Sequence, residues 1–389
     1  MTVFKYPLAT SSWDENEIRA LEAVIASGQF SMGELVKRFE EEFASYFRSK
    51  YAVMVNSGSS ANLLLVAALR YTQNELLKLE RGDEVIVPAV SWSTTYFPLH
   101  QYGLKLKFVD IDRHSLNFDL NALTNAITNE TKAIMAVNLL GNPNDFHVLN
   151  ELIEKNSIIL LEDNCESMGA KFNGKYTGSF GVMGSFSFFF SHHISTMEGG
   201  MVLTDDEELY HIMLSLRSHG WTRQLPLNNK LTTKNNRDPF HNSFDFILPG
   251  YNLRPLEMSG AIGTQQLKKF PKFLVKRTEN ATHFVDIMQC HEKFTIQKEI
   301  GQSSWFGFSL LLREPWQGER ASVIQKLNHL GFECRPIVAG NFLNNSVINH
   351  LNYTVHDELK NADYVEENGL FIGNHHFCMK EAIDHLQKL

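Results

Sequence analysis

The chain has 389 residues and 43% of them are hydrophobic, which is enough for a large core and for more than one domain. Its 36 Lys and Arg residues stand against 44 Asp and Glu residues, and the net charge of −8 argues against a nucleic-acid surface or an anionic-membrane surface. No segment approaches the ~20 apolar residues of a membrane span, and residues 1–17 lack a signal-peptide pattern. We therefore expect a cytoplasmic protein without nucleic-acid or membrane partners.

The four cysteines are widely separated and form no C-x-x-C or Cys/His pair of the kind that binds a metal: Cys165, Cys290, Cys334 and Cys378. Scattered buried thiols are the simpler interpretation, so we expect no metal site.

Residues 14–48 carry apolar positions at helical spacing, and residues 51–71 run from an apolar stretch through a small-residue turn into a helical pattern. Strand-like apolar runs then recur, separated by helical or loop segments, at residues 83–92, 106–112, 133–141 and 157–163. Strands that alternate with helices predict a mainly parallel sheet with both faces covered.

A polar stretch at residues 222–245 interrupts this pattern, and it is too long for a plain connector, so we expect a lid, an arm or a partner-binding loop. After about residue 265 a helical segment leads into a smaller α/β region. The sequence thus predicts a large part at 1–265 and a smaller part at 266–389.

Polar residues follow the ends of several predicted strands. Ligands of a parallel sheet gather beyond the carboxyl ends of its strands, so these residues are the first candidates for a site. They lie at residues 57–60, 91–95, 163–166 and 191–193.

The sequence SGSSAN at 57–62 lies between a strand-like run and a helical one. Backbone N–H groups and the hydroxyls of Ser59 and Ser60 would converge near the positive end of that helix, where a phosphate binds well. A helix N-cap with a tight turn at Gly58 is the commoner use of such a sequence, and on this motif alone we favour it.

Asp163 ends the apolar run at 157–163 and would place a carboxylate at the edge of the sheet. A pyridoxal cofactor needs such a carboxylate against its ring nitrogen, because an ionised Asp keeps that nitrogen protonated and lets the ring accept electrons. A solvated helix start explains Asp163 equally well when this residue is taken alone.

Four spaced segments together resemble the sugar aminotransferases that act on nucleotide-linked ketosugars: SGSSAN, LLEDNCESMGA, GSFGVMGSFSFFFSHHISTMEGG and LPGYNLRPLEMSGAIG. They occur in the right order and the resemblance covers most of the chain. It implies an α/β protein with the aspartate-aminotransferase fold, which is fold type I of the transferases that use pyridoxal phosphate (PLP). Residues 1–265 would form a large cofactor-binding domain with a mainly parallel mixed sheet flanked by helices, and residues 266–389 a smaller C-terminal α/β domain.

This family usually carries a lysine that binds the cofactor covalently, seven residues after the first Ser of its S-F-S-F element, and counting from Ser185 reaches His192. Imidazole cannot form the stable link that a lysine amine forms with an aldehyde, so the resemblance implies noncovalent pyridoxal 5'-phosphate or pyridoxamine 5'-phosphate. Histidine still suits proton transfer, because its ordinary pKa of ~6.5 lets it act as a base and then as an acid. His193 is the neighbouring alternative, and only the family register favours His192.

Within the family, this substitution resembles the 3-dehydratases that act on GDP-linked 4-ketosugars and serve colitose and lipopolysaccharide O-antigen biosynthesis. That likeness implies a lyase that removes the C3 hydroxyl, with L-glutamate as amine donor and with 2-oxoglutarate and ammonia as products. A CDP-linked branch also has histidine at this position but carries an iron–sulfur cluster bound by grouped cysteines. The isolated cysteines of this chain favour the branch without an iron–sulfur cluster.

The resemblance assigns further residues one at a time. It implies that Trp92 stacks on the cofactor ring, that Glu166 lies near the ring's 3-hydroxyl and that Ser187 binds the phosphate. Core packing is the alternative for Trp92. Asn252 resembles a phosphate ligand donated by the neighbouring subunit, which predicts an obligatory homodimer with its active site at the subunit interface.

His219 and Arg254 are weaker candidates for the substrate pocket, and capping or a surface ion pair explains each of them equally well. Two other functions also fit the chain. One is a nucleotide-sugar aminotransferase in which His192 replaces the anchoring lysine by engineering, although His193 and the dehydratase-like context argue against it. The other is a non-catalytic sensor on the same fold, which would not need the Asp163 that this chain retains.

Overall fold

The computed structural model describes residues 5–232, 240 and 244–389. Its α-helices are α1 (Glu15–Ser27), α2 (Glu34–Phe47), α3 (Gly58–Tyr71), α4 (Ser93–Gln101), α5 (Leu120–Ala126), α6 (Phe146–Asn156), α7 (Glu207–Arg217), α9 (Glu257–Met288), α10 (Arg320–His329), α11 (Lys360–Asn368) and α12 (Lys380–Leu386).

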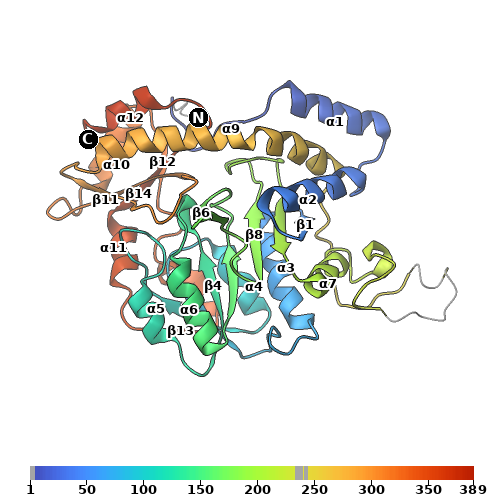
Figure 1. Cartoon of the computed structure of the whole chain (residues 1–389). Coiled ribbons are helices and arrows are strands. Elements are labelled where there is room, and N and C mark those ends of the chain that lie inside the picture. The colour runs from blue at the N-terminus through green and yellow to red at the C-terminus, as the bar shows by residue number, and fades with distance from the viewer. Residues whose placement is uncertain (1–4, 233–239, 241–243) are drawn as a thin grey trace.

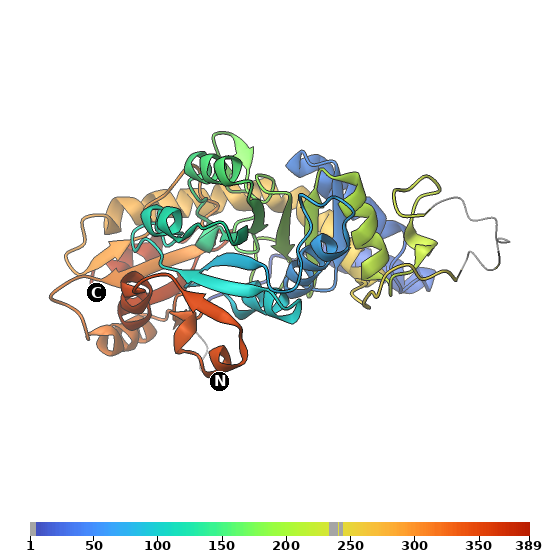
Figure 2. The same ribbon diagram turned by 90° about the horizontal axis from the view of Figure 1, so that it is seen from below.

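An eight-stranded sheet lies at the centre of the molecule, with helices on both sides (Figures 1 and 2). β9 is antiparallel to both of its neighbours, and the other neighbouring pairs are parallel, so the predicted mixed and mainly parallel sheet is confirmed. In spatial order the strands are β1 (Tyr51–Val55), β9 (Gly200–Thr204), β8 (Met183–Ser187), β5 (Ile159–Asp163), β4 (Thr131–Val137), β2 (Glu84–Pro88), β3 (Lys105–Val109) and β13 (Tyr353–Val355).

Both faces of this sheet are buried, which explains why its strands are continuous apolar runs rather than alternating ones. Along β1, Val53 and Val55 belong to the cluster that contains α3, α4 and α7. Ala52 and Met54 point the other way, toward α2 and α9. Helices therefore cover the sheet on both sides, and only its edges are left for a site.

Two predicted elements end earlier than their apolar pattern. The helical pattern at 14–48 is divided into α1 and α2, because Gly28 adopts the left-handed conformation (φ 70°) and caps α1 with its N–H on the carbonyl of Ile25. The predicted strand at 133–141 stops at Val137, and the chain then turns through Leu140 with a positive φ of 55°. That turn directs the following residues along the carboxyl-end edge of the sheet.

A second, antiparallel sheet contains β10 (Phe294–Ile296), β11 (Gly307–Leu312), β14 (Gly369–Gly373) and β12 (Cys334–Arg335), and a short hairpin contains β6 (Lys171–Phe172) and β7 (Lys175–Tyr176). The second sheet packs with the end of α9, α10 and α12 around Phe284 and Phe308. Helix α9 crosses residue 265, and β13 joins the large sheet from the C-terminal region. The division at 265 and 266 therefore stays a proposal.

The first described residues lie next to this second sheet. Tyr6 forms a bridge with Phe332, and the backbone N–H of Leu8 donates to Glu333 (2.9 Å). From there an N-terminal segment at 5–14 runs to the start of α1, and on the way its Ser12 hydroxyl donates to Gln266 of α9 (2.6 Å).

In the polar stretch at 222–245, residues 233–239 and 241–243 lie outside the described part of the chain. The parts on either side lie at one end of the molecule (Figure 2), where Trp221 stacks on Phe246 with ring centroids 6.0 Å apart. The choice among a lid, an arm and a partner-binding loop stays open. Among the helices that the structure describes, none combines the length and the apolar character needed to cross a bilayer.

Candidate active site

One cavity of about 300 Å³ opens at the carboxyl-end edge of the large sheet. Strands β1, β2, β5 and β8 run in the same direction, so their carboxyl ends meet there. The volume of the cavity lies at the lower end of the range of ~300–1,000 Å³ for small-molecule sites. The structure brings all four predicted polar segments together in its wall, through Ser57, Gly58, Ser59, Ser91, Trp92, Thr94, Asp163, Cys165, Glu166, Ser191 and His192.

Asp163 is the last residue of β5, and it is buried in the cavity wall. Its Oδ2 accepts hydrogen bonds from the Thr95 hydroxyl (2.7 Å) and the Asn62 side-chain amide (2.8 Å). Its Oδ1 accepts from the backbone N–H of Cys165 (3.2 Å). These three donors fix the orientation of the carboxylate.

The N-terminus of α3 forms another wall of the cavity. The Ser57 hydroxyl caps the helix by accepting from the N–H of Ser60 (3.1 Å), as the N-cap interpretation predicts. Within the described part of the chain, the N–H groups of Gly58 and Ser59 have no hydrogen-bond partner, so the positive helix end can receive an anion. A Cβ on Gly58 would lie 2.6 Å from the Cβ of Ser187, so glycine lets α3 approach β8 this closely.

The two neighbouring histidines have different surroundings. His192 lines the cavity. His193 is buried, its Nε2 lies 3.1 Å from the carbonyl oxygen of Ser304, and its ring centroid lies 5.7 Å from that of Phe306. His193 therefore belongs to the packing, and His192 is the histidine that a bound molecule can reach.

The His192 ring meets Phe306 edge to face, with centroids 5.2 Å apart. Its Nδ1 is buried without a hydrogen-bond partner among the described residues, which leaves Nε2 as the accessible ring nitrogen. Burial, reinforced by the positive charges of Arg277 and Arg335, lowers the pKa of His192 to about 3. The ring is therefore neutral at neutral pH and can accept a proton.

Glu166 and Arg335 lie next to each other in the cavity wall. Arg335 Nη2 lies 3.9 Å from Glu166 Oε1, and Glu166 Oε2 accepts from the N–H of Leu140 (3.1 Å). Burial raises the pKa of Glu166, and the charge of Arg335 opposes that shift. Among the described residues, Arg335 is the one lysine or arginine in the cavity wall, so no lysine stands ready to bind a cofactor aldehyde.

Comparison with known proteins places this site in a family. The sequence profile of the DegT/DnrJ/EryC1/StrS aminotransferase family matches residues 11–388. The chain belongs to this family. The predicted resemblance to sugar aminotransferases is thereby confirmed.

Individual members of the DegT/DnrJ/EryC1/StrS family are similar over their whole length. The chain is 57% identical over 385 residues to the GDP-4-keto-6-deoxy-D-mannose 3-dehydratase of Yersinia pseudotuberculosis, which covers 99% of this chain and 98% of that one. A structure of the E. coli GDP-4-keto-6-deoxy-D-mannose-3-dehydratase with bound hydrated PLP superposes with a TM-score of 0.97 at 55% identity, over 100% of this chain and 99% of that one. A GDP-4-keto-6-deoxymannose-3-dehydratase with a trapped PLP–glutamate geminal diamine gives a TM-score of 0.96 at 56% identity, over 99% of each chain. The predicted α/β fold is thereby confirmed.

The remaining residues that the sequence predicted for the site fall into two groups. Ser187 and Trp92 line the cavity, and 56% of the Trp92 surface is exposed, so the core-packing alternative for Trp92 is wrong.

The second group lies outside the cavity wall: Ser60, His219, Asn252 and Arg254. The Ser60 hydroxyl donates to the Asn56 side chain (2.6 Å), and Asn252 is exposed and accepts from Arg254 Nε (3.0 Å). His219 has a positive φ of 66° and donates its N–H to the carbonyl of Tyr251 (2.6 Å). Within one chain, these residues therefore make local contacts, as expected for capping or surface residues.

Sequence reasoning assigned no role to three residues of the site: Asn62, Thr95 and Arg335. Asn62 stands in the SGSSAN motif one helical turn after Gly58, so helical periodicity places it on the same face, and this signal could have found it. Thr95 lies in the predicted segment at 91–95 but carried no motif. Arg335 reaches the cavity from β12 in the second sheet, and no local sequence pattern predicts such a contact between distant segments.

Proposed function

We propose that this chain is a PLP-dependent 3-dehydratase that removes the C3 hydroxyl of GDP-4-keto-6-deoxymannose with L-glutamate as amine donor. The products are GDP-4-keto-3,6-dideoxymannose, 2-oxoglutarate and ammonia. The observation that carries this proposal is His192, which stands in a cavity wall without a lysine. Full-length identity of 57% to a 3-dehydratase of this substrate supports the choice of sugar and nucleotide.

The residues present fit a pyridoxal cofactor held without a covalent bond. Asp163 offers a fixed carboxylate to a pyridine nitrogen, and Trp92 offers an aromatic face. The free N–H groups of Gly58 and Ser59, with the Ser187 hydroxyl, suit a phosphate. When bound, the cofactor supplies an electron sink that stabilises the negative charge left by proton removal.

His192 is proposed to move the protons. In the first half-reaction its Nε2 would take the proton from Cα of glutamate and deliver it to the cofactor carbon that receives the amine. In the dehydration it would take a proton from that carbon and deliver one to the C3 hydroxyl, which leaves as water. The low pKa keeps the ring in its basic form. An anionic phosphate or carboxylate bound nearby raises that pKa toward the value that suits a base near neutral pH.

Arg335 and Glu166 are proposed to orient the reactants. The guanidinium of Arg335 lies 3.9 Å from Glu166 and 4.8 Å from the ring centroid of Phe371, and neither contact uses its N–H donors at hydrogen-bond distance, so they are available for a carboxylate of glutamate. The Glu166 carboxyl, with its raised pKa, lies on the same wall and suits a hydrogen bond to the cofactor's 3-hydroxyl.

We propose a homodimer in which Asn252 serves the phosphate site of the partner subunit, with His219 and Arg254 near the partner's substrate. Asn252 is exposed and does not line the cavity of its own chain. Large apolar side chains are exposed at the cavity and near Asn252, among them Trp92 (56%), Phe189 (45%) and Leu256 (57%). Such side chains on a folded protein are typical of a covered interface.

The same proposal places the enzyme in the cytoplasm, in the synthesis of colitose for O-antigen, and without an iron–sulfur cluster. The four cysteines are unpaired: Cys165, Cys290, Cys334 and Cys378. Within the described residues, no group of three His, Cys, Asp or Glu side chains is arranged to hold a metal ion.

The test incubates the purified protein with PLP, L-glutamate and GDP-4-keto-6-deoxymannose. We expect equal amounts of 2-oxoglutarate, ammonia and the 3,6-dideoxy-4-ketosugar, and no cofactor mass on the protein after borohydride treatment. An aminosugar product would identify an aminotransferase instead. Absence of both 2-oxoglutarate and dideoxysugar would leave a non-catalytic role.

A further inference from the structure

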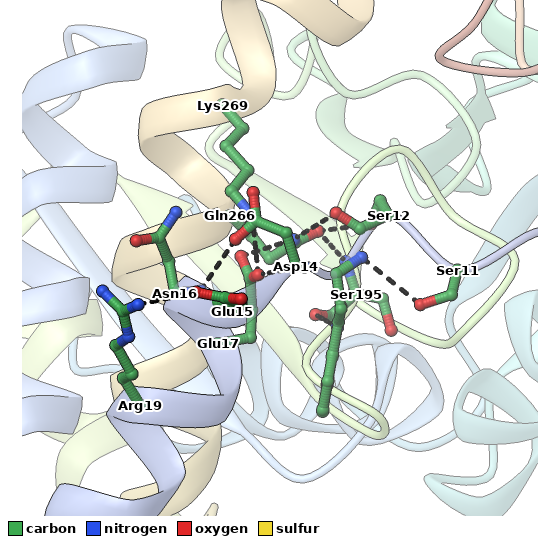
Figure 3. A network of polar contacts seen from close by, with 11 residues as sticks. Ser11, Ser12, Asp14, Glu15, Asn16, Glu17, Arg19, Ser195, Gln266 and Lys269 are labelled. Carbon is green, nitrogen blue, oxygen red and sulfur yellow. Dashed lines mark hydrogen bonds and ion pairs between the residues drawn. The ribbon is translucent and has the colours of Figure 1, made fainter.

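The loop at residues 188–199, between β8 and β9, carries His192. Figure 3 shows Ser195 of this loop next to Gln266 and Ser12. Ser195, three residues after His192, has both of its backbone groups engaged. Its N–H donates to Oε1 of Gln266 (3.2 Å), and its carbonyl accepts from Nε1 of Trp13 (3.0 Å). The first contact comes from α9 and the second from the N-terminal segment.

Gln266 is fully buried, and its amide makes four hydrogen bonds. Oε1 accepts from the Ser12 hydroxyl (2.6 Å) and from Ser195, and Nε2 donates to the Ser12 carbonyl (3.2 Å) and to Glu17 Oε1 (2.8 Å). This uses the full capacity of an amide, and a flipped amide would oppose donors to donors. Gln266 is therefore fixed in one orientation, with its oxygen on the loop.

The far side of Gln266 is anchored as well. Glu17 is fully buried, and its Oε2 accepts from Lys269 Nζ (2.6 Å) and from the backbone N–H of Asp14 (2.8 Å). Lys269 also pairs with Asp14 Oδ1 (2.8 Å), and the resulting hydrogen bond lowers the pKa of Asp14 to about 2. Figure 3 shows these side chains converging on Gln266 from α1 and α9, so its position does not depend on the loop.

The His192 ring, in contrast, has no hydrogen bond to hold it within the described part of the chain. Its place depends on its backbone and on ring packing against Phe306. Backbone hydrogen bonds also hold the loop: the N–H groups of Phe188, His192 and Thr196 donate to the carbonyls of Gly199 (2.9 Å), Phe189 (2.9 Å) and Phe188 (3.0 Å). Between His192 and Thr196 the backbone of Ser195 is held by Gln266 and Trp13. Loss of the contact to Ser195 would loosen the segment between His192 and Thr196.

We propose that Gln266 is a positioning residue for His192: its amide fixes Ser195 and thereby holds the His192 ring at the distance from the bound reactants that proton transfer requires. This inference rests on the proposed role of His192 as the base. A displacement of about 1 Å of a reacting group can lower a rate by ~100-fold, so even a small movement of the loop would be measurable.

The test compares Gln266→Met with two other variants. Gln266→Met keeps the length of the side chain and removes the acceptor for Ser195. Trp13→Phe keeps an aromatic ring, although a smaller one, and removes the donor to the Ser195 carbonyl, so it tests the same loop if Gln266→Met folds poorly. Ser12→Ala is the control, because it removes a hydrogen bond to the same Gln266 oxygen and leaves the contact to Ser195 in place.

The first measurement is hydrogen–deuterium exchange of residues 188–199 in the protein without cofactor. We expect faster exchange in Gln266→Met and Trp13→Phe and unchanged exchange in Ser12→Ala. Unchanged exchange in Gln266→Met overturns the proposal, whatever catalytic activity this variant has. This measurement decides the question even if the proposed function fails.

The second measurement is the first-order rate constant of the half-reaction at saturating glutamate, with protium or deuterium at Cα. For Gln266→Met we expect a loss of ~10–100-fold, a larger isotope effect, and a PLP dissociation constant within about threefold of the unaltered protein. A merely structural role would weaken PLP binding in parallel and leave the isotope effect unchanged, and a loss equal to that of Ser12→Ala would also contradict the proposal. If the unaltered protein converts no glutamate, the proposed function fails. The exchange experiment then still tests whether the contact between Gln266 and Ser195 holds the loop.

Discussion

The two sides of the His192 loop differ in how their polar groups are satisfied. Toward the cavity, His192 has no hydrogen-bond partner for its ring, and the N–H groups of Gly58 and Ser59 are free within the described residues. Toward the interior, Nε2 of His193 lies 3.1 Å from a carbonyl while its Nδ1 is unpaired among the described residues, and Gln266 uses every hydrogen bond that its amide can make. Unsatisfied groups bind ligands and satisfied groups stabilise the fold, so substitutions on the two sides should separate activity from stability.

The largest expected effect is that of His192→Asn. General acid–base catalysis contributes ~10²–10⁴-fold, so we expect both half-reactions to slow by that factor, because asparagine cannot carry the proton. Single-turnover kinetics with glutamate and with the ketosugar measure this. PLP affinity and the unfolding transition should change little, because the ring makes no hydrogen bond to the described residues.

His193→Asn is the matched control for that experiment. It removes the contact with the Ser304 carbonyl and leaves a small cavity beside Phe306, so it should lower the free energy of unfolding and spare the rate of the folded fraction. Turnover that survives in His192→Asn but is lost in His193→Asn would reverse the assignment of the base.

The second prediction concerns Arg277, which is buried on the interior side. Its guanidinium donates to the carbonyls of Phe306 (3.1 Å) and Asn374 (2.9 Å), and burial lowers its pKa to about 10. Arg277→Met leaves these carbonyls without a donor, and we expect the free energy of unfolding to fall by about 3 kcal/mol. Urea denaturation measures the loss.

Arg277→Lys sharpens this prediction, because lysine keeps the charge and loses the planar set of donors. It should recover only part of the stability. Equal stability of the methionine and lysine variants would show that the geometry of the donors, and not the charge, decides, and full recovery in Arg277→Lys would show the reverse. A variant of Arg277 that loses catalytic rate but keeps its free energy of unfolding would show that Arg277 serves the reaction and does not stabilise the fold.

The same contrast explains which parts of the molecule were predictable from the sequence. The cavity-side residues directly follow apolar strands, so one rule about the ends of parallel strands placed Ser57, Trp92 and Asp163 at a common edge. The family register then singled out His192. The structure agrees because both faces of the sheet are covered and only the edge is open.

Three other features were not predictable in this way: the burial of Gln266 on the interior side, the position of Arg335 on the cavity side, and the end of the first helix at Gly28. Gln266 lies on a helix, where a polar side chain is normally expected at the surface. It is buried because the N-terminal segment folds over α9. Arg335 enters the cavity from a different sheet. The break at Gly28 depends on a left-handed residue that interrupts an otherwise continuous helical pattern. Each of these depends on contacts between distant segments, which apolar periodicity does not record.

The third prediction is an effect of pH on stability through His375. This buried histidine lies near Thr10 (3.2 Å) and the Pro7 carbonyl (2.9 Å), and burial, together with the charge of Arg277, lowers its pKa to about 4. An unfolded histidine has a pKa of ~6.5, so between these two values the unfolded chain binds more protons and stability falls as the pH falls. From neutral pH to pH 5 the loss due to this residue should be roughly 2 kcal/mol.

His375→Gln removes that titration and keeps a polar side chain. We expect a lower stability at pH 7 but a shallower decline toward pH 5 than in the unaltered protein. Chemical denaturation at several pH values measures both slopes. Parallel slopes would show that other groups cause the acid sensitivity; His192, His193 and His376, whose pKa values are also lowered by burial, are the next candidates.

The smallest expected effect lies on the cavity side, at Arg335. Removing its charge in Arg335→Met should raise KM for glutamate by about tenfold and leave PLP affinity nearly unchanged, because a charged hydrogen bond to a carboxylate contributes on that order. Its positive charge also lowers the pKa of His192, so the acid limb of the pH–rate profile should move to higher pH in this variant. Arg335→Lys keeps the charge and should restore the position of the acid limb while recovering only part of the glutamate affinity, since lysine lacks the bidentate geometry. A variant whose KM for the ketosugar rises while that for glutamate does not would assign Arg335 to the sugar nucleotide instead.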